Sequence, residues 1–322
     1  MTPASVEPLR PPAARAPFMR GFAAWASERF PLVHGVAALG LYVLVLIFTR
    51  ALVLTGPIRL GFGDLPGFFA VWSFFLTLRV LDEHKDYEDD CRFHPQRVLQ
   101  RGTVTLHQLK VAGVAAVCVQ AAVSLWRDGG IGAVTLWWLG TMAWAGLMAA
   151  EFFQREWLRR RLLVYAVSHM LIMPLAVLWI AQLSVPGAVL TPPIWRLAAF
   201  AFMAGASFEI ARKAKGPEEE QPGVDSYSLR LGAGGAAALL AALGITSMAL
   251  LASMVALLVR APLALGVCAV GAIAVVVAAA AYARHPSASA RRFNETVVGL
   301  GLLLGEVTVA AVLLVGRGVL WI

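Results

Sequence analysis

The most acidic stretch of the chain carries carboxylates at a spacing that could serve a metal ion. Asp82, Asp86 and Asp90 are four residues apart. In a continuous helix this spacing places the three side chains in one stripe, where their like charges repel each other. A cation relieves that repulsion, and Mg²⁺ commonly binds one or two carboxylates together with substrate phosphates. The spacing therefore predicts that Mg²⁺ ions hold a diphosphate against the stripe.

Two arginines downstream could contact the same ligand. Arg97 and Arg101 lie in the stretch Arg-Val-Leu-Gln-Arg-Gly, and guanidinium groups bind phosphate oxygens bidentately. Carboxylates and basic groups in a membrane protein together favour an amphiphilic diphosphate. The alternative is a solvated acidic face on a loop. The basic stretch, together with a second charged segment further along, disfavours that alternative.

The second charged segment runs from residue 208 to residue 232. It begins at Glu209, continues through Arg212, Lys213 and a polar loop, and reaches Ser226 and Tyr227 before the next apolar run. The two segments together hold 11 of the 19 acidic residues. This concentration is the most informative feature of the chain.

The rest of the sequence predicts an all-α polytopic membrane protein. Of 322 residues, 59% are hydrophobic and only 14% are charged, whereas soluble domains are about 25% charged. Apolar runs of roughly 20 residues can each cross a hydrocarbon core of about 30 Å. Backbone hydrogen bonding inside lipid requires such runs to be helices. Nine spans are predicted, at residues 33–56, 65–81, 108–126, 131–150, 162–182, 194–210, 233–258, 262–283 and 296–316.

The basic residues set the predicted orientation. With the N-terminus in the cytosol and alternating spans, 21 of the 27 Lys and Arg residues lie on the cytosolic side. Both charged segments fall on that side. We therefore expect an integral protein of the inner (cytoplasmic) membrane, with the N-terminus and both charged segments in the cytosol.

One domain is predicted after a disordered lead. Residues 1–32 are rich in Pro and Arg and predict a disordered cytosolic segment, and residues 33–322 predict a single transmembrane domain. The basic residues are spread over short connections rather than gathered in one module, which excludes nucleic acid as a partner.

The first charged segment resembles the first motif of the UbiA superfamily of intramembrane prenyltransferases. That motif is Asn-Asp-x-x-Asp-x-x-x-Asp, followed by Arg-Pro-Leu-x-x-Gly. Asp86 and Asp90 match it directly, while Asp82 stands for the Asn and Glu83 for an Asp. In the following stretch, Val98 replaces the Pro.

The second segment resembles the second motif of that family, in a degenerate form. Glu209 lies near the first aspartate position and Glu219 or Glu220 near the last. Gly223, Ser226 and Gly232 keep the family's spacing. The middle aspartate is lost, and Lys213 or Lys215 lies in its neighbourhood.

The resemblance implies a bundle of nine helices with cytosolic motif loops and a Mg²⁺-dependent prenyltransferase. The substrate would be an isoprenoid diphosphate, and membrane lipid would be a further partner. The prenyl acceptor is unknown, with aromatic compounds among the candidates. The implied metal ligands are Asp82, Glu83, Asp86, Asp90, Glu209 and Glu219. The implied catalytic residues are Glu83, Asp86, Asp90 and Lys213. The implied diphosphate contacts are Arg97, Arg101, Arg212, Lys213, Ser226 and Tyr227. Lys213 with Arg212 could replace the charge of one metal ion.

Two other functions remain open. A transporter or carrier usually places polar groups near the midplane of several helices, whereas these spans are nearly free of charge. A relative of the prenyltransferases that no longer catalyses transfer is the other alternative, because the second motif is degenerate.

Overall fold

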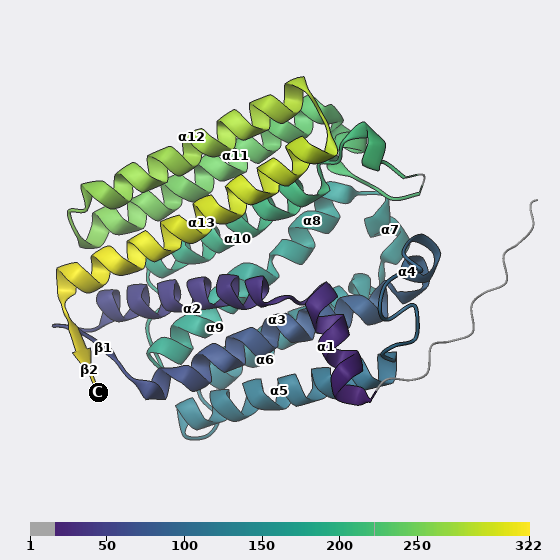
Figure 1. Cartoon of the computed structure of the whole chain (residues 1–322). Helices are drawn as coiled ribbons and strands as arrows, with labels where there is room; N and C mark the ends of the chain where they lie inside the picture. Colours follow the sequence, from purple (N-terminus) through teal and green to yellow (C-terminus); the bar gives the residue numbers. More distant parts are fainter. Residues whose placement is uncertain (1–16, 222) are drawn as a thin grey trace, which may run out of the picture.

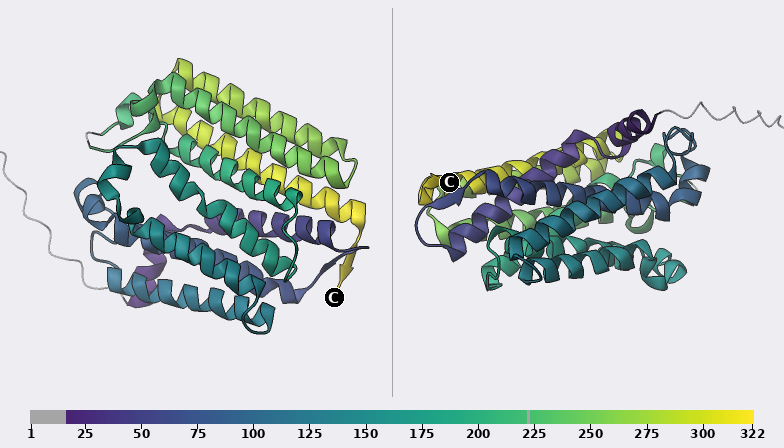
Figure 2. Two further views of the ribbon diagram at one scale, coloured as in Figure 1. Left: turned by 180° about the vertical axis from the view of Figure 1, so that it is seen from behind. Right: turned by 90° about the horizontal axis from the view of Figure 1, so that it is seen from below.

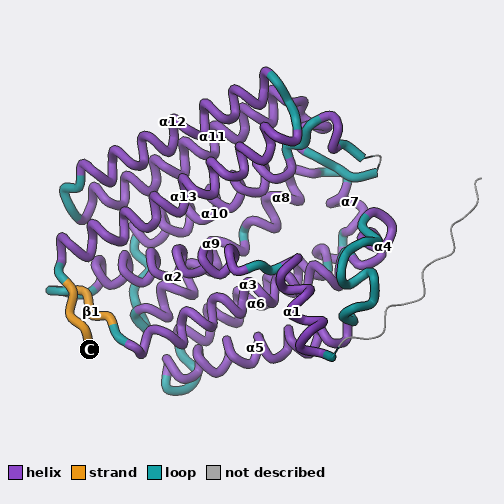
Figure 3. The backbone as a smooth tube through the Cα atoms, viewed as in Figure 1, coloured by secondary structure: helices purple, strands orange, loops and turns teal. Residues whose placement is uncertain are grey.

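The computed structural model describes residues 17–221 and 223–322, which form a layered bundle of helices with one short pair of strands at its edge (Figure 1, Figure 3). The helices are α1 (Phe18–Arg29), α2 (Leu32–Val53), α3 (Leu65–Lys85), α4 (Tyr87–Phe93), α5 (Leu106–Asp128), α6 (Ala133–Ala149), α7 (Arg155–Arg159), α8 (Leu162–Met170), α9 (Ile172–Ser184), α10 (Pro192–Lys213), α11 (Tyr227–Leu258), α12 (Pro262–Arg284) and α13 (Ala288–Arg317). The strands are β1 (Ile58–Leu60) and β2 (Val319–Trp321), and the 3-10 turns are η1 (Phe62–Asp64), η2 (Glu151–Phe153) and η3 (Pro217–Glu219).

The all-α membrane architecture is confirmed. Within the described ranges, eight helical stretches are long and apolar enough to cross a membrane, and α6, with 17 residues, is a shorter apolar helix. These nine stretches correspond to the nine predicted spans. α8 and α9 together supply the fifth span. Pro174, in the first turn of α9, lacks an N–H and its ring crowds the carbonyl of Met170, which accounts for the break between the two helices.

The helices are arranged in three groups (Figure 1, Figure 2). α11, α12 and α13 pack against one another on one side of the molecule, and α3, α5 and α6 lie on the other. α2, α9 and α10 lie between them, and α2 contacts α13, α3 and α9. Phe48, Trp179 and Phe200, one from each central helix, are fully buried. Burial on several sides explains why these three helices are apolar around most of their circumference.

Capping side chains fix the helices that flank the charged segments. Thr105 accepts a hydrogen bond from the Gln108 N–H, and the Gln108 side chain accepts one from the Thr105 N–H, so a capping box starts α5. Ser226 caps α11 and Ser287 caps α13 in the same way, each accepting a bond from the backbone N–H three residues on. These caps satisfy N–H groups that a helix start leaves without partners.

A buried ion pair closes the end of the bundle opposite the charged segments. The Arg50 guanidinium in α2 donates to both carboxylate oxygens of Asp64 in η1, at 2.8 and 2.6 Å, and to the Arg59 carbonyl at 2.5 Å. Beside it, β1 and β2 pair in parallel, with Ile58 opposite Val319. The segments that follow the C-terminal ends of α2 and α13 are therefore paired with each other here.

The expected disordered lead is corrected in part. Residues 18–29 form α1, whereas residues 1–16 lie outside the described residues. Trp25 in α1 is fully buried in a cluster with Val80 of α3 and Leu109 of α5. The Pro and Arg content of residues 1–32 did not predict α1, because this helix is stabilised by packing against the bundle rather than by its own composition.

Candidate functional site

Both predicted motif segments lie at one end of the bundle. α3 and α10 each end there, together with α4, α7 and the loop from α10 to α11 (Figure 1). The two loops also approach each other: a Cβ added to Gly223 would lie 3.5 Å from Cζ of Phe93 in α4. No hydrogen bond or ion pair joins residues 82–90 to residues 209–230 across the described part of the chain.

The predicted stripe of three carboxylates is interrupted. α3 ends at Lys85, and Asp86 lies at its C-cap with φ −98° and ψ 8°, outside helical geometry. Asp90 belongs to the next helix, α4. The expectation of one continuous stripe over the three aspartates is therefore wrong, because the chain turns at Asp86.

Glu83 faces the protein interior rather than the solvent. Its side chain is 0% exposed, and its Oε1 accepts a bond from Nε of Arg29 in α1 at 2.6 Å. Its other oxygen, Oε2, is buried with no hydrogen-bond partner among the described residues. A buried carboxylate needs such a cation, since removal of charge from water is expensive.

Asp90 is also held by arginines. The Arg97 guanidinium donates to Asp90 Oδ2 at 2.5 Å, and Nη2 of Arg29 lies 3.9 Å from the same oxygen. Arg97 was predicted to contact a diphosphate, and here it reaches the motif itself. Arg101 lies four residues further along, in the loop between α4 and α5, and is exposed.

Asp82 and Asp86, near the end of α3, have side chains 45% and 43% exposed. Glu88 and Asp89 in α4 are also accessible. Lys85 lies between Asp82 and Asp86, with Nζ 3.3 Å from the first and 4.0 Å from the second. Burial raises the pKa of Asp86, Lys85 lowers it in part, and the neighbouring Asp82 raises it further. The net direction is upward, so the site disfavours negative charge at Asp86 unless a cation is near.

Asp89 connects the first segment to the α6–α7 region. It accepts a hydrogen bond from Arg159 and lies 3.6 Å from the guanidinium of Arg155. Arg155 in turn pairs with the buried Glu151, at 2.9 Å. Two arginines of α7 thus contact α4 through Asp89, in partly exposed ion pairs.

In the second segment, the Glu209 carboxylate is occupied by the chain's own cations. Lys213 Nζ lies 2.6 Å from one of its oxygens and the Arg212 guanidinium 2.7 Å from the other. All three residues lie in the last turns of α10. Glu209 is therefore poorly suited to a metal ion, while the two bases could still face an anion.

The remaining residues of the second segment stabilise the loop. Arg291 of α13 binds both oxygens of Glu219, at 3.1 and 3.0 Å. Glu220 accepts hydrogen bonds from Ser226 at 2.6 Å and from Ser228 at 2.7 Å. Tyr227 is buried. We therefore do not carry Glu219, Ser226 or Tyr227 into the proposed site.

The donor set for Mg²⁺ is limited to the first segment. Among the described residues there is no group of three or more His, Cys, Asp or Glu side chains that could hold a metal ion. Asp82 and Asp86 are accessible carboxylates next to each other, and Mg²⁺ can bind through two carboxylates when phosphates and water complete its coordination. The residues present thus fit one such ion. Asp82 also lies near Lys85 and Arg79, but it and Asp86 stay 45% and 43% exposed. Glu83, Asp90 and Glu209 are paired with bases and only 0%, 14% and 17% exposed.

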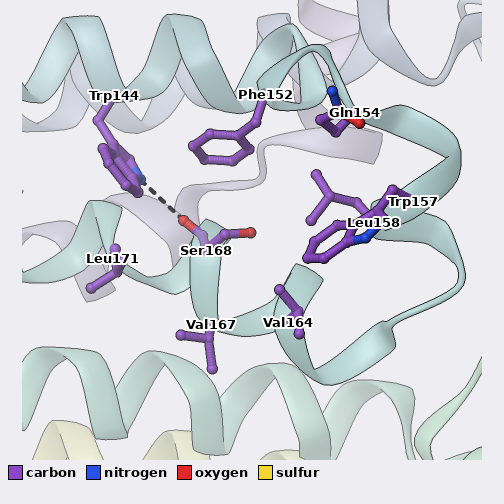
Figure 4. A pocket seen from close by; sticks show the side chains of 9 residues that line it. All are labelled: Trp144, Phe152, Gln154, Trp157, Leu158, Val164, Val167, Ser168 and Leu171. Atoms are coloured by element: carbon purple, nitrogen blue, oxygen red, sulfur yellow. Dashed lines mark hydrogen bonds between the residues drawn. The ribbon is translucent and has the colours of Figure 1, made fainter.

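An apolar cavity of about 440 Å³, open to the outside of the bundle, lies between the end of α6, α7 and α8, and α7 contacts the first segment through Arg159 and Asp89 (Figure 4). Its lining residues are Trp144, Phe152, Gln154, Trp157, Leu158, Val164, Val167, Ser168 and Leu171. Trp144 donates from its indole N–H to the Ser168 carbonyl at 3.0 Å, and its ring packs edge-on against Phe152.

One wall of this cavity includes Phe152, which lies in a strained turn of the backbone. Glu151, Phe152 and Phe153 all have positive φ, at 47°, 51° and 57°. Left-handed geometry costs roughly 1–2 kcal/mol per non-glycine residue. Strained segments tend to persist at functional sites. Here the turn directs the Phe152 ring toward Trp144 and the His169 ring.

Sequence reasoning missed the contribution of α1 to the site. Besides Arg29, Glu28 accepts a hydrogen bond from the Val98 N–H at 3.0 Å, within the Arg-Val-Leu stretch. The approach is close enough that a Cβ on Gly21 would lie 2.6 Å from the Thr103 carbonyl oxygen. The sequence signal that could have shown this is the pair Glu28 and Arg29 just before the first apolar run. Arg29 entered the prediction only as one of the Lys and Arg residues that set the membrane orientation.

Comparison with known proteins identifies the fold. No family model matches the sequence, and no curated protein matches it either. A solved structure described as giving insights into digeranylgeranylglyceryl phosphate synthase in membranes has a TM-score of 0.61 and 15% identity, covering 91% of this chain and 99% of the other. The apo structure of a UbiA homolog from Aeropyrum pernix K1 has a TM-score of 0.60 and 16% identity, covering 86% of this chain and 97% of the other. The chain therefore has the fold of these two structures, which is the fold that the resemblance to the UbiA superfamily implied.

Proposed function

We propose that this protein is an intramembrane prenyltransferase that moves an isoprenyl group from an isoprenoid diphosphate to an acceptor. The observation that carries the proposal is the pairing of a charged site with an apolar cavity at one end of a UbiA-type bundle. The charged site suits a diphosphate and the cavity suits a hydrocarbon chain, so together they fit one amphiphilic substrate. We place this end of the bundle at the cytosolic face on the distribution of Lys and Arg.

In this proposal the first segment binds the diphosphate end of the substrate through Mg²⁺. Asp82 and Asp86 would hold Mg²⁺, which supplies positive charge to the leaving diphosphate. Arg101 is exposed nearby and can reach phosphate oxygens, while Arg97 holds Asp90 in place. Of the carboxylates that the sequence predicted to be catalytic, this proposal keeps Asp86 and sets aside Glu83 and Asp90, and it pairs Asp86 with Asp82.

The second segment supplies fixed cations. Lys213 and Arg212 are anchored by Glu209 and are 32% and 47% exposed, so each keeps donors free for an anion. Pre-positioned cations stabilise charge that develops on the diphosphate as the allylic C–O bond breaks. The electron pair of that bond leaves with the diphosphate, the acceptor then forms a bond to the allylic carbon, and the acceptor releases a proton. The apolar walls keep water from the carbocation.

One observation favours a second candidate, a relative that binds the diphosphate without transferring the chain. The second segment contains no free carboxylate at Glu209, because both of its oxygens are paired with bases. Such a protein would bind substrate with little help from Mg²⁺. Substrate binding with no product from any acceptor would favour this candidate.

A thermal-shift measurement on detergent-purified protein tests the proposal. Farnesyl and geranylgeranyl diphosphate are added with Mg²⁺ or with a chelator. We expect stabilisation that is strongest with Mg²⁺, and we expect Asp86→Asn and Asp82→Asn to remove the Mg²⁺-dependent part. Asp225→Asn is the matched control, because Asp225 forms an exposed pair with Arg230 outside the proposed site.

Two results would contradict the proposal. One is the absence of any shift with either chain length. The other is an equal Mg²⁺-dependent shift in the wild type and in both site variants.

A further inference from the structure

α1 brings a cation into the first segment from outside the predicted motifs. Arg29 lies 2.6 Å from the fully buried Glu83 and 3.9 Å from Asp90. Glu83 has one oxygen on Arg29 and one buried oxygen without a partner among the described residues. Arg29 is thus the cation paired with Glu83, and it lies second to Arg97 at Asp90; the sequence assigned both carboxylates to metal ions.

The position of Arg29 is fixed by independent contacts. Trp25, one turn earlier, is fully buried against α3 and α5. Glu28 accepts a hydrogen bond from the Val98 N–H, and Gly21 lies so close to Thr103 that a side chain there would clash with its carbonyl. α1 is therefore held across the end of α3 at several points, and Arg29 does not depend on its ion pair for placement.

We propose that Arg29 is a positioning residue that serves as the built-in cation of the first segment. It occupies Glu83 and, together with Arg97, Asp90, and so leaves Asp82 and Asp86 as the carboxylates proposed to bind Mg²⁺. This inference deepens the proposed function and rests on it for the identity of the substrate. The ion pair itself makes a prediction that needs no substrate: without Arg29, the buried Glu83 carboxylate requires another cation, while Asp90 keeps Arg97.

Mg²⁺ alone is therefore the first probe. Purified wild type and Arg29→Met are unfolded thermally in detergent with a chelator and with increasing MgCl₂. We expect Arg29→Met to lose several degrees of Tm in the chelator and to regain most of that loss with Mg²⁺. The wild type should change little, because its carboxylates are already neutralised. The physical reason is that a buried, unpaired carboxylate is strongly destabilising.

Three variants separate this role from simple structural support. Trp25→Phe weakens the docking of α1 without removing charge, so its loss of Tm should not be restored by Mg²⁺. Arg29→Met with Glu83→Met removes both charges, and should recover Tm in the chelator and reduce the rescue by Mg²⁺. Arg29→Lys keeps the charge, and should fall between wild type and Arg29→Met. The Lys variant and the double variant keep the test decisive if Arg29→Met does not fold.

Several outcomes overturn the inference: the same Mg²⁺ response in Arg29→Met and wild type, a rescue by Mg²⁺ in Trp25→Phe as large as in Arg29→Met, or an undiminished rescue in the double variant. Diphosphate binding is then measured in the same samples. A Mg²⁺ rescue in Arg29→Met, with no diphosphate shift in any sample, would support the role of Arg29 while contradicting the proposed function. The two claims can thus fail separately.

Discussion

The ammonium group of Lys85 donates a hydrogen bond to the hydroxyl of Tyr165, with 3.1 Å between Nζ and Oη. Lys85 ends α3, in the first charged segment, and Tyr165 lies in α8, whose Val164, Val167 and Ser168 line the apolar cavity. The same ammonium lies 3.3 Å from Asp82. One cation therefore connects the carboxylates that we assign to Mg²⁺ with the helix that would contact a hydrocarbon chain.

We expect Lys85→Met to destabilise the protein more than Tyr165→Phe. The Lys85 side chain is only 8% exposed, and its loss leaves Asp82 and Asp86 to repel each other. Loss of the tyrosine hydroxyl removes one hydrogen bond, worth about 0.5–1.5 kcal/mol. Thermal unfolding of both variants in detergent measures the difference. An equal or smaller loss in Lys85→Met would show that Lys85 does not relieve the repulsion.

A larger side chain in the cavity should change which substrates bind. Val167 lines the cavity wall on α8, and Val167→Trp would fill part of its roughly 440 Å³. We expect the variant to bind geranylgeranyl diphosphate less well while it retains more of its affinity for a shorter chain. Thermal shifts of the variant and the wild type with diphosphates of different chain length measure this change in preference. Val307→Trp, an exposed position on α13 away from this cavity, is the matched control. Uniform loss for all chain lengths would place the hydrocarbon elsewhere.

The ion pair at the opposite end of the bundle should contribute strongly to stability. Removal of one partner from a buried pair costs about 3–5 kcal/mol, and Asp64→Asn leaves the Arg50 guanidinium with a neutral partner. Asp225→Asn breaks the exposed pair with Arg230, for which about 0–1 kcal/mol is expected. The comparison uses Tm in detergent. Similar values for the two variants would mean that water reaches Arg50.

The pairing of Glu219 with Arg291 should make stability depend on pH. Burial raises the pKa of Glu219, but Arg291 and the Gly216 N–H lower it more, so the net pKa lies below its ordinary value of 4.5. A depressed pKa in the folded state contributes stability that is present above pH 4.5 and is lost as the pH falls through the folded pKa.

Glu219→Gln should therefore be less stable than the wild type at pH 7, and the difference should shrink below pH 4.5. Thermal unfolding of both proteins from pH 7 to pH 3 measures it. A difference that stays constant with pH would assign the effect to packing rather than to charge.

The sequence alone determined the architecture. Each apolar run must satisfy its own backbone hydrogen bonds in lipid, so run length and hydropathy predict spans with little need of tertiary context. The nine stretches of the structure match the nine predicted spans for this reason. The two charged segments were also located correctly at the ends of the second and sixth spans, since charged residues cannot continue into the bilayer.

Only the tertiary structure decided which of the charged residues are available. Asp82 and Glu83 are neighbours in the sequence, yet one is 45% exposed and the other is buried against Arg29. The partner lies 54 residues away in a helix whose position depends on Trp25 packing between α3 and α5. Pairings over such separations leave no periodic trace in the sequence. A pattern of carboxylates can therefore indicate a metal site, but the fold decides which carboxylates remain free to bind the ion.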